Sequence, residues 1–194
     1  MIIDTDNYEL SDIKIIPFPG GEWHVELPTI PFKHVHIWAK MRTWTDWGKL
    51  KFVLSALVHD GVRPYVFMPY VPGARQDRIQ AKFAYSIEEY AHDLWNVAGL
   101  TAVDVHSQAA EDVLGERVQN FHVLPVTTYF PDLSNEFDIV LAADKGAVER
   151  ANQVARIINC PRVVKCEKER DPKTGKLSGF KLPEMENREW DRLR

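Results

Sequence analysis

The chain has 194 residues, a net charge of −4, and hydrophobic and charged contents of 45% and 27%. These values are ordinary for a globular protein. The acidic balance argues against a general nucleic-acid-binding protein, which carries a basic surplus or stripe. No apolar run is long enough to span a membrane, and the N-terminus does not resemble a signal peptide. Cys160 and Cys166 lack zinc-site or disulfide spacing, so we expect two reduced thiols in a cytoplasmic protein.

The first third of the chain predicts strands and one helix. Residues 13–18 and 23–27 read as strands around a turn at 19–21, and residues 34–39 as a third strand. A helix is expected over residues 45–60, with Gly61 ending it. Its apolar face consists of Trp47, Leu50, Leu54, Leu57 and Val58. A short strand at residues 65–68 follows, and it leads into the loop 69–80, PYVPGARQDRIQ.

A second helix is predicted at residues 86–98, with Ser86 and Glu89 as a capping box and Gly99 as its stop. Its apolar stripe consists of Ile87, Tyr90, Ala91, Leu94, Trp95 and Ala98. A strand at 102–105, a short helix near 109–114 and a strand at 121–126 follow. This alternation of strands and helices predicts an α/β fold with a largely parallel central sheet.

The end of the chain repeats the scheme on a smaller scale. After a connector at residues 129–136 we expect a buried strand at 137–143, a helix at 146–158 and a strand at 162–164. The inward side chains of this helix are predicted to be Ala147, Val148, Ala151, Val154, Ala155 and Ile158. A charged hairpin at 165–182 would turn at Thr174-Gly175. We therefore predict a domain at 1–133 and an incomplete second domain at 134–194.

Polar clusters follow three of the predicted strands, where ligands bind in open α/β sheets. Arg75, Gln76 and Asp77 follow the strand at 65–68. Asp104 and His106 stand two residues apart at the end of the next strand, so they would share one face. Each cluster also has an interpretation without a ligand. Residues 75–77 could be a solvated loop, and His106 could be a hydrogen-bonded histidine with a purely structural role.

The third cluster, Asp144-Lys145-Gly146, opens a predicted helix. The N–H groups at a helix N-terminus can bind phosphate, and Asp144 could hold Mg²⁺. Asp144 could equally be only an N-cap. The cations of the 165–182 hairpin are either a solvated charged loop or a mobile lid that neutralises a transferring phosphoryl group. Common nucleotide motifs such as G-x-x-x-x-G-K-[ST] and G-x-G-x-x-G are absent from the sequence.

Five ordered motifs stand out: Phe18-Pro19-Gly20-Gly21-Glu22, Pro69-Tyr70 through Ala74-Arg75-Gln76-Asp77-Arg78, Asp104-Val105-His106-Ser107, Ala143-Asp144-Lys145-Gly146-Ala147 and Lys168-Glu169-Arg170-Asp171. In order and approximate spacing they resemble the motifs of ribose-phosphate diphosphokinases (PRPP synthetases), and their short forms look most like phage-type members. The resemblance implies tandem phosphoribosyltransferase-type α/β domains, the second incomplete in this chain. It also implies Mg²⁺-dependent transfer of diphosphate from ATP to ribose 5-phosphate, in the host cytoplasm if a phage encodes the chain.

The resemblance assigns roles by position. Phe18 and Glu22 would contact adenine from a neighbouring subunit of a homo-oligomer. Arg75, Gln76 and Asp77 would hold the nucleotide and its phosphates. His106 would bind Mg²⁺ or the triphosphate, supported by Asp104, and Asp144 would lie at the metal and sugar site. Lys168 and Arg170 would stabilise the transition state, which fits a reaction that depends on charge neutralisation and positioning.

Two departures from the family pattern stand out. Gly20 occupies a position where the family usually has Asp or Asn, and no Asp-Asp…Asp-x-x-x-Thr sugar-phosphate loop occurs in the sequence. We expect either that the chain is truncated or that a partner covers the unfinished sheet edge. Alternative functions are the same chemistry on ADP-ribose for NAD synthesis, a non-catalytic nucleotide-binding subunit of such an assembly, and a phosphoribosyltransferase.

Overall fold

The computed structural model describes residues 2–5, 8–10, 13–29, 35–129, 133, 137–170 and 177–181. The chain forms two compact units, Met1–Pro125 (unit 1) and Val126–Arg194 (unit 2). The sequence placed the domain boundary after residue 133, in a connector most of which lies outside the described residues. No helix of the described part is both long and apolar enough to cross a membrane.

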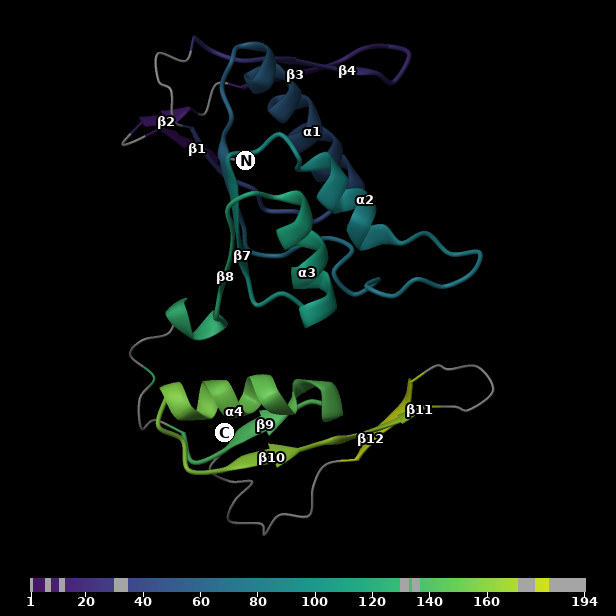
Figure 1. Cartoon of the computed structure of the whole chain (residues 1–194), viewed down its shortest axis with the longest axis vertical. Coiled ribbons are helices and arrows are strands. Elements are labelled where there is room, and N and C mark those ends of the chain that lie inside the picture. Colours follow the sequence, from purple (N-terminus) through teal and green to yellow (C-terminus); the bar gives the residue numbers. More distant parts are fainter. Residues whose placement is uncertain are drawn as a thin grey trace. The chain divides into compact units, whose positions relative to one another are not determined.

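Unit 1 is built on a six-stranded sheet of order β2-β1-β5-β6-β7-β8 (Figure 1). Its strands are β1 (Ile2–Thr5), β2 (Tyr8–Leu10), β5 (His36–Trp38), β6 (Tyr65–Met68), β7 (Gly99–Val103) and β8 (Phe121–Leu124). The last four pair in parallel, whereas β1 runs antiparallel to β5 and β2. The α/β prediction with a mainly parallel sheet is therefore confirmed. The strands β1 and β2 were not predicted.

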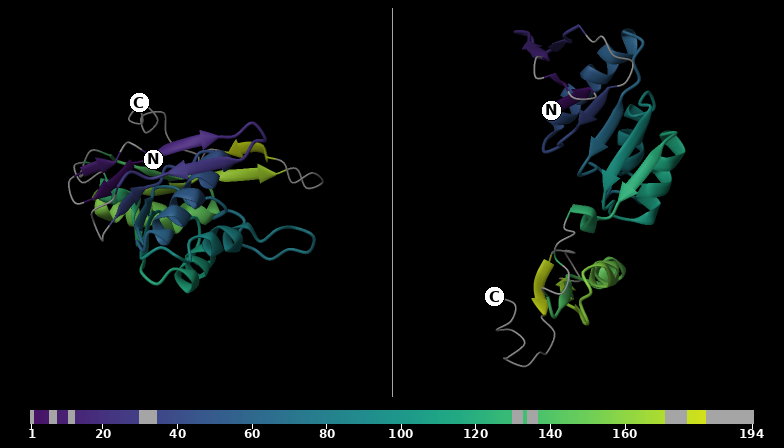
Figure 2. Two further views of the ribbon diagram at one scale, coloured as in Figure 1. Left: turned by 90° about the horizontal axis from the view of Figure 1, so that it is seen from above. Right: turned by 90° about the vertical axis from the view of Figure 1, so that its left-hand side faces the viewer.

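Three helices connect the parallel strands: α1 (Trp44–His59), α2 (Ser86–Asp93) and α3 (Gln108–Arg117). Because β5 to β8 lie side by side in chain order, right-handed crossovers place all three helices on one face of the sheet, as Figures 1 and 2 show. On the sheet, Trp38 packs against Phe67 with ring centroids 4.6 Å apart, and His36 stacks on Tyr65 at 5.3 Å. Trp38 remains 48% exposed and Tyr65 39% exposed.

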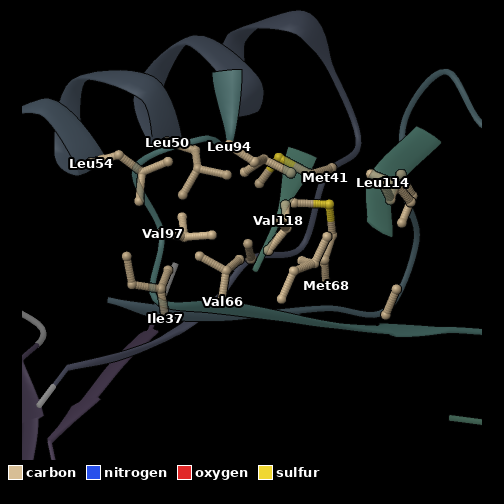
Figure 3. Close-up of a cluster of buried hydrophobic side chains, with 14 of the residues drawn as sticks. Ile37, Met41, Leu50, Leu54, Val66, Met68, Leu94, Val97, Leu114 and Val118 are labelled. Atoms are coloured by element: carbon tan, nitrogen blue, oxygen red, sulfur yellow. The ribbon is translucent and has the colours of Figure 1, made fainter. Parts of the chain in front are cut away.

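The core of unit 1 lies between the sheet and these helices (Figure 3). Leu50 of α1, Ile37 of β5, Met68 of β6 and Leu114 of α3 are fully buried there. Burying a side chain of this size stabilises a fold by about 1.5–3 kcal/mol. The predicted apolar face of α1 is confirmed except for Val58, which is only half-buried.

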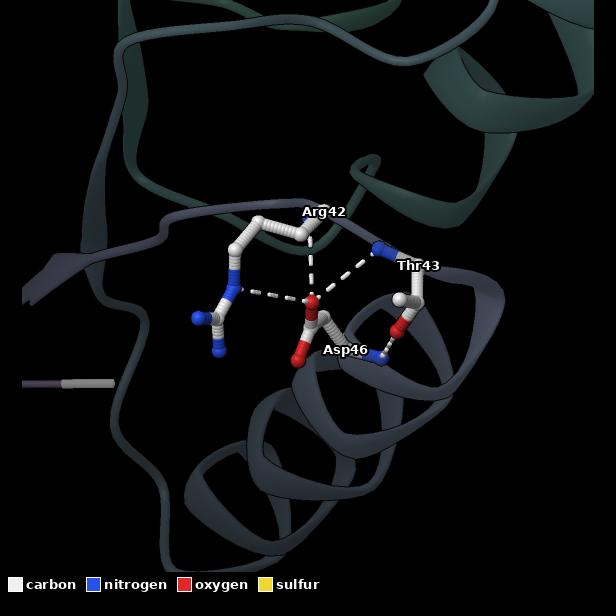
Figure 4. A network of polar contacts seen from close by, with 3 residues as sticks. All are labelled: Arg42, Thr43 and Asp46. Atoms are coloured by element: carbon white, nitrogen blue, oxygen red, sulfur yellow. Dashed lines mark hydrogen bonds and ion pairs between the residues drawn. The ribbon is translucent and has the colours of Figure 1, made fainter.

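The start of α1 is fixed by a capping box that was not predicted (Figure 4). The Thr43 hydroxyl accepts a hydrogen bond of 3.2 Å from the Asp46 N–H. In return, Asp46 accepts bonds of 3.0 Å from the backbone N–H groups of Thr43 and Arg42. These bonds lower the pKa of Asp46, the largest cause being the bond from the Arg42 backbone.

The predicted start of α2 at Ser86 is confirmed, but its predicted cap and its predicted end were wrong. Tyr85, not Ser86, is the N-cap, and its side chain makes no capping bond, so the predicted capping box is absent. The helix ends at Asp93, which leaves Trp95 61% exposed rather than on an apolar stripe. Gly99 does not stop the helix but opens β7, where a Cβ atom would lie only 2.8 Å from the Tyr65 ring. Close packing in the sheet explains this glycine.

The hairpin of β3 (Lys14–Pro17) and β4 (Trp23–Glu26) confirms the first predicted strand pair. Its turn closes through a bond of 2.8 Å from the Phe18 N–H to the Glu22 carbonyl. Val25 packs on the core, and Lys49 of α1 lies 5.3 Å from the centroid of the Trp23 ring. These contacts attach the hairpin to α1.

Unit 2 contains the parallel pair β9 (Val140–Ala142) and β10 (Val163–Lys165), with α4 (Val148–Ile157) between them in the chain. The 3₁₀ turns η1 (Val126–Tyr129) and η3 (Lys145–Ala147) precede β9 and α4 respectively. The prediction of a buried strand at 137–143 was only partly right, because Phe137 is 45% and Leu141 38% exposed. The predicted inward residues of α4 are buried or half-buried.

The predicted charged hairpin is present as β11 (Glu167–Arg170) and β12 (Leu177–Lys181), which pair antiparallel. The register places Lys168 opposite Phe180 and Arg170 opposite Leu177, with an irregularity between Glu169 and Arg170. Its predicted turn at Thr174-Gly175 lies outside the described residues.

Candidate functional site

The loop after β6 begins with a firmly anchored half. Val71 and Ala74 are buried, and Gly73 adopts φ +75°, a left-handed conformation that favours glycine. A Cβ atom at Gly73 would lie 2.5 Å from the Tyr90 ring and 3.2 Å from the Ile87 nitrogen of α2. The backbone of the loop therefore touches α2 directly, which only glycine permits.

Tyr90 links this loop to α1. Its ring meets Trp47 edge-on with centroids 4.6 Å apart and stacks on Trp44 at 5.4 Å. Burial is the main cause that raises the pKa of Tyr90, and the nearby Tyr70 and Asp93 raise it further. The loop thus rests on an aromatic cluster of Tyr90, Trp44 and Trp47.

Beyond this anchor the loop presents polar side chains. Arg75 and Gln76 are exposed, and Asp77 is half-buried. The Gln76 N–H donates a bond of 2.8 Å to the Gly73 carbonyl, which continues the tight backbone path into the polar segment. In Figure 1 the segment between β6 and α2 projects away from the sheet on its helical side.

The structure brings this loop into contact with the turn after β7. The Ser107 hydroxyl donates a hydrogen bond to the Asp77 carboxylate. Parallel pairing explains the proximity, because Phe67 of β6 lies opposite Thr101 of β7 and the carboxyl ends of both strands reach the same edge. Ser107 also caps α3 by accepting a bond of 3.2 Å from the Ala110 N–H.

The argument that placed Asp104 and His106 on one strand face was wrong. β7 ends at Val103, and Asp104 adopts φ +48°, so strand alternation does not apply to this pair. The Asp104 N–H donates a bond of 3.0 Å to the Leu124 carbonyl of β8, which fixes the start of the turn. Val105 is buried and His106 is exposed. His106 therefore lies on the surface of a turn that its neighbours hold in place.

The hairpin residues Phe18 and Glu22 lie apart from these two clusters. Figure 1 shows the β3–β4 hairpin beyond the amino ends of the parallel strands, whereas the Arg75 loop and the His106 turn leave their carboxyl ends. Phe18 is 50% exposed, with its ring centroid 6.3 Å from that of His24. The hairpin of one chain is thus not brought to the Arg75 loop of that chain.

Gly20 has a local structural relationship with Glu22. A Cβ atom at Gly20 would lie 2.5 Å from the Glu22 carboxylate, so this carboxylate occupies the space where a larger residue would begin. Because the obstacle is the end of a long side chain, Asp or Asn at this position would displace Glu22 rather than the backbone.

Asp144 and the charged hairpin belong to unit 2. Asp144 is the N-cap of η3 and accepts a bond of 3.1 Å from the Ala147 N–H, so the interpretation as an N-cap is confirmed. β9 and β10 pair with Ala142 opposite Lys165, and the Cys166 N–H donates a bond of 2.8 Å to the Ala142 carbonyl. This pairing places the chain that leads to Asp144 beside the base of the hairpin. The side chains of Lys168 and Arg170 lie outside the described part.

Within the described residues, no three or more His, Cys, Asp or Glu side chains gather as a metal site. Mg²⁺ does not require such a cluster, because it is often held by one or two carboxylates together with water and substrate phosphates. Asp144 fits such a role, because a carboxylate offers about four acceptor positions and can cap a turn and bind a cation at once.

A surface hollow of about 560 Å³ lies elsewhere in unit 1, between α3 and β8. Its lining residues are Gln108, Glu111, Asp112, Gly115, Glu116, Phe121 and Val123. The sequence did not indicate it.

The sequence motif Asp104–Ser107 contained Ser107, but no role was assigned to that residue. Its position directly before a helix was the signal for a cap.

The geometry defines an α/β protein with polar loops at the carboxyl ends of parallel strands, where such folds bind ligands. Comparison with known proteins finds similarity to ribose-phosphate pyrophosphokinases of three archaea. The chain is 30% identical to that of Sulfurisphaera tokodaii over 175 residues, 87% of this chain and 60% of the relative. It is 28% identical to that of Pyrococcus furiosus over 159 residues, 77% of this chain and 55% of the relative.

The third relative, from Saccharolobus solfataricus, is 29% identical over 179 residues, 87% of this chain and 60% of its own length. The chain thus spans somewhat more than half the length of these curated relatives. No family model matches the sequence. The similarity extends over most of this chain and so includes both units.

Proposed function

We propose that the chain belongs to the ribose-phosphate pyrophosphokinase family, as a phage-type member, and that it transfers diphosphate from ATP to the anomeric hydroxyl of ribose 5-phosphate. The observation that carries the proposal is the contact between Asp77 and Ser107. It joins two of the motifs that resemble the family, at the edge of the sheet where α/β proteins bind ligands. Similarity to three proteins with this name supports the same conclusion.

Unit 1 supplies the proposed ATP site. Arg75 and Gln76 are exposed on a loop whose base is anchored on α2, so their side chains can reach a ligand from a fixed backbone. A guanidinium group binds phosphate oxygens through two parallel N–H donors. His106, exposed on the neighbouring turn, is proposed to act at the triphosphate or its metal, with Asp104 as its support.

Unit 2 supplies the proposed catalytic groups. Asp144 is the N-cap of η3, which leads into α4, and it follows the strand β9 that pairs beside the base of the hairpin carrying Lys168 and Arg170. Bound Mg²⁺ would neutralise phosphate charge. The two cations are proposed to stabilise the charge that develops on the transferred group, as phosphoryl transfer requires.

The reaction forms one bond and breaks one. The anomeric oxygen of the sugar attacks the β-phosphorus of ATP, and the bond from that phosphorus to the oxygen of the α-phosphate breaks. AMP leaves with the electron pair, and the hydroxyl proton passes to a base or to water. In this proposal the residues of the chain position the two reactants and balance charge, and the transfer requires no covalent intermediate with the protein.

The direct test is incubation of the purified chain with ATP and Mg²⁺ and either ribose 5-phosphate or ADP-ribose. We expect AMP and PRPP with ribose 5-phosphate, measured by ³¹P NMR. Arg75→Ala should lower the rate at limiting ATP by at least about tenfold, whereas Arg156→Ala, an exposed arginine on α4, should not. If AMP is released with ADP-ribose but not with ribose 5-phosphate, ADP-ribose is the acceptor. If AMP is released with neither acceptor, the proposed activity of this chain is refuted.

A further inference from the structure

We propose that Ser107 is a positioning residue for Asp77 and, through Asp77, for the exposed segment 75–84. Only the effect on ATP binding rests on the proposed function. The Ser107 hydroxyl makes two bonds with different chemistry. It accepts from the Ala110 N–H at 3.2 Å and donates to the Asp77 carboxylate. A hydroxyl has one donor and two acceptor positions, so both bonds can form together.

The exposed segment has little else to hold it. Its backbone bonds at 2.8 Å from Gln76 to Gly73 and 3.1 Å from Phe83 to Gln80 are local. One long backbone bond, 3.5 Å from the Ile87 N–H to the Gln76 carbonyl, reaches α2, and it holds only the start of the segment. Ile79 is 85% and Phe83 70% exposed, so neither side chain anchors the segment in a core. Among the described residues, the Asp77 carboxylate makes the one side-chain hydrogen bond that joins segment 75–84 to another element.

The bond also has a consequence for phosphate binding. The Asp77 carboxylate is negative and follows Arg75 and Gln76, which are proposed to meet the triphosphate. A hydrogen bond from Ser107 holds the Asp77 carboxylate in one orientation. The loop then loses less conformational entropy when ATP binds. Removal of the donor should therefore weaken ATP binding by about tenfold, the effect of one hydrogen bond to a charged group.

Substitutions at Ser107 separate this role from helix capping. Glycine is an acceptable N-cap, with a cost of only a few tenths of a kcal/mol, but it cannot donate to Asp77. Threonine can both cap and donate. Aspartate can cap but cannot donate, and it would place a second negative charge beside Asp77. A matched control is Thr43→Gly, which removes the side-chain N-cap of α1 without touching the loop.

The first measurement is independent of activity. Arg75, Arg78 and Lys82 are trypsin sites within the exposed segment. In the full chain, Ser107→Gly should accelerate tryptic cleavage at these sites several-fold, and Ser107→Thr should leave the rate as in the wild type. Asp77→Ala should have the same effect as Ser107→Gly, and the double variant should be no faster than either, because both substitutions remove one interaction.

The second measurement is the Michaelis constant for ATP in the diphosphate-transfer assay. Ser107→Gly should raise it about tenfold with little change in turnover rate, Ser107→Asp should raise it further, and Ser107→Thr should restore it. If Ser107→Gly changes cleavage no more than Thr43→Gly does, or if the two single variants act additively, the positioning role is wrong. If cleavage behaves as expected but every variant and the wild type lack activity, the positioning role holds and the proposed function fails.

Discussion

The indole nitrogen of Trp47 donates a hydrogen bond of 2.8 Å to a carboxylate oxygen of Asp93. The other oxygen of this carboxylate lies 2.8 Å from the Lys51 ammonium group. Asp93 thus joins the end of α2 to α1, close to the aromatic cluster under the Arg75 loop. The support of the candidate site therefore includes a polar link as well as packed rings.

Asp93→Ala should lower the free energy of unfolding of unit 1 by about 1–3 kcal/mol, because the indole N–H would lose its acceptor. Asp93→Asn should cost less, since its amide oxygen can still accept from Trp47. Urea unfolding followed by tryptophan fluorescence measures both. The control is Lys14→Ala, which breaks an exposed ion pair with Glu26 and should change stability by less than about 0.5 kcal/mol. Equal losses in Asp93→Ala and the control would contradict the structural role.

Gly73→Ala should cost about 2–4 kcal/mol, from left-handed backbone strain and from collision with the Tyr90 ring. Gly61→Ala provides a matched control. Gly61 has nearly the same φ, +76°, but nothing lies within 4 Å of a Cβ atom there, so only the strain of about 1–2 kcal/mol should appear. Urea midpoints of the two variants measure the difference. Similar losses at both positions would show that Tyr90 yields to the added methyl group.

Asp46 should contribute stability that depends on pH. Its pKa is lowered in the folded state, mainly by the bond from the Arg42 backbone, so its contribution is fully present above the unfolded-state value of about 3.9. The contribution is lost as the pH falls through the folded-state pKa. The difference in stability between the wild type and Asp46→Asn should therefore shrink below about pH 4. Urea midpoints of both proteins at pH 6 and pH 2.5 measure this difference in stability. An equal difference at both pH values would contradict a stabilising role of the ionised Asp46 carboxylate.

Arg170→Ala should lower the turnover rate of diphosphate transfer by at least about a hundredfold while changing the Michaelis constant for ATP little. The reason is that a group acting on developing charge stabilises the transition state more than bound ATP. Lys181→Ala is the control, because Lys181 is an exposed cation on the other strand of the same hairpin. Equal losses in turnover rate and ATP affinity would refute the assigned role.

If nucleotide sites are shared between subunits, inactive variants should complement each other. The β3–β4 hairpin with Phe18 lies beyond the opposite ends of the parallel strands from the turn with His106 (Figure 1). We expect Phe18→Ala and His106→Ala, refolded together, to recover AMP formation in mixed oligomers. Arg75→Ala mixed with His106→Ala should stay inactive, since both changes affect one chain's share of the site. If the mixture of Phe18→Ala and His106→Ala is no more active than each variant alone, nucleotide sites are not shared between subunits.

The contact between loop and turn could be anticipated from the sequence, but its atoms could not. Short strands with polar residues directly after them predict adjacent parallel strands with clusters at one edge, and the structure has Asp77 beside the turn after β7. The bond itself goes to Ser107, which the strand-end rule did not single out. A capping serine and a positioning serine look alike in a sequence, because the distinction depends on what lies opposite the hydroxyl.

The errors arose where tertiary contacts override local signals. Ser86 and Glu89 match a capping box, yet Tyr85 occupies the N-cap position. Gly99 looks like a helix stop, but close packing against the Tyr65 ring requires it within the sheet. The left-handed conformation of Asp104 ends strand alternation two residues before His106. None of these features can be read from the spacing of residues alone.

The order of the parallel strands bears on how unit 1 is made. Each of β6, β7 and β8 pairs with the parallel strand synthesised immediately before it, and β5 pairs with the earlier β1. No strand of this sheet has to wait for a later segment to be inserted beside it. During synthesis the sheet can therefore grow by one strand and one helix at a time, each addition closing a short loop of chain at modest entropic cost. The site loop after β6 can reach its partner Ser107 as soon as β7 and the start of α3 have left the ribosome.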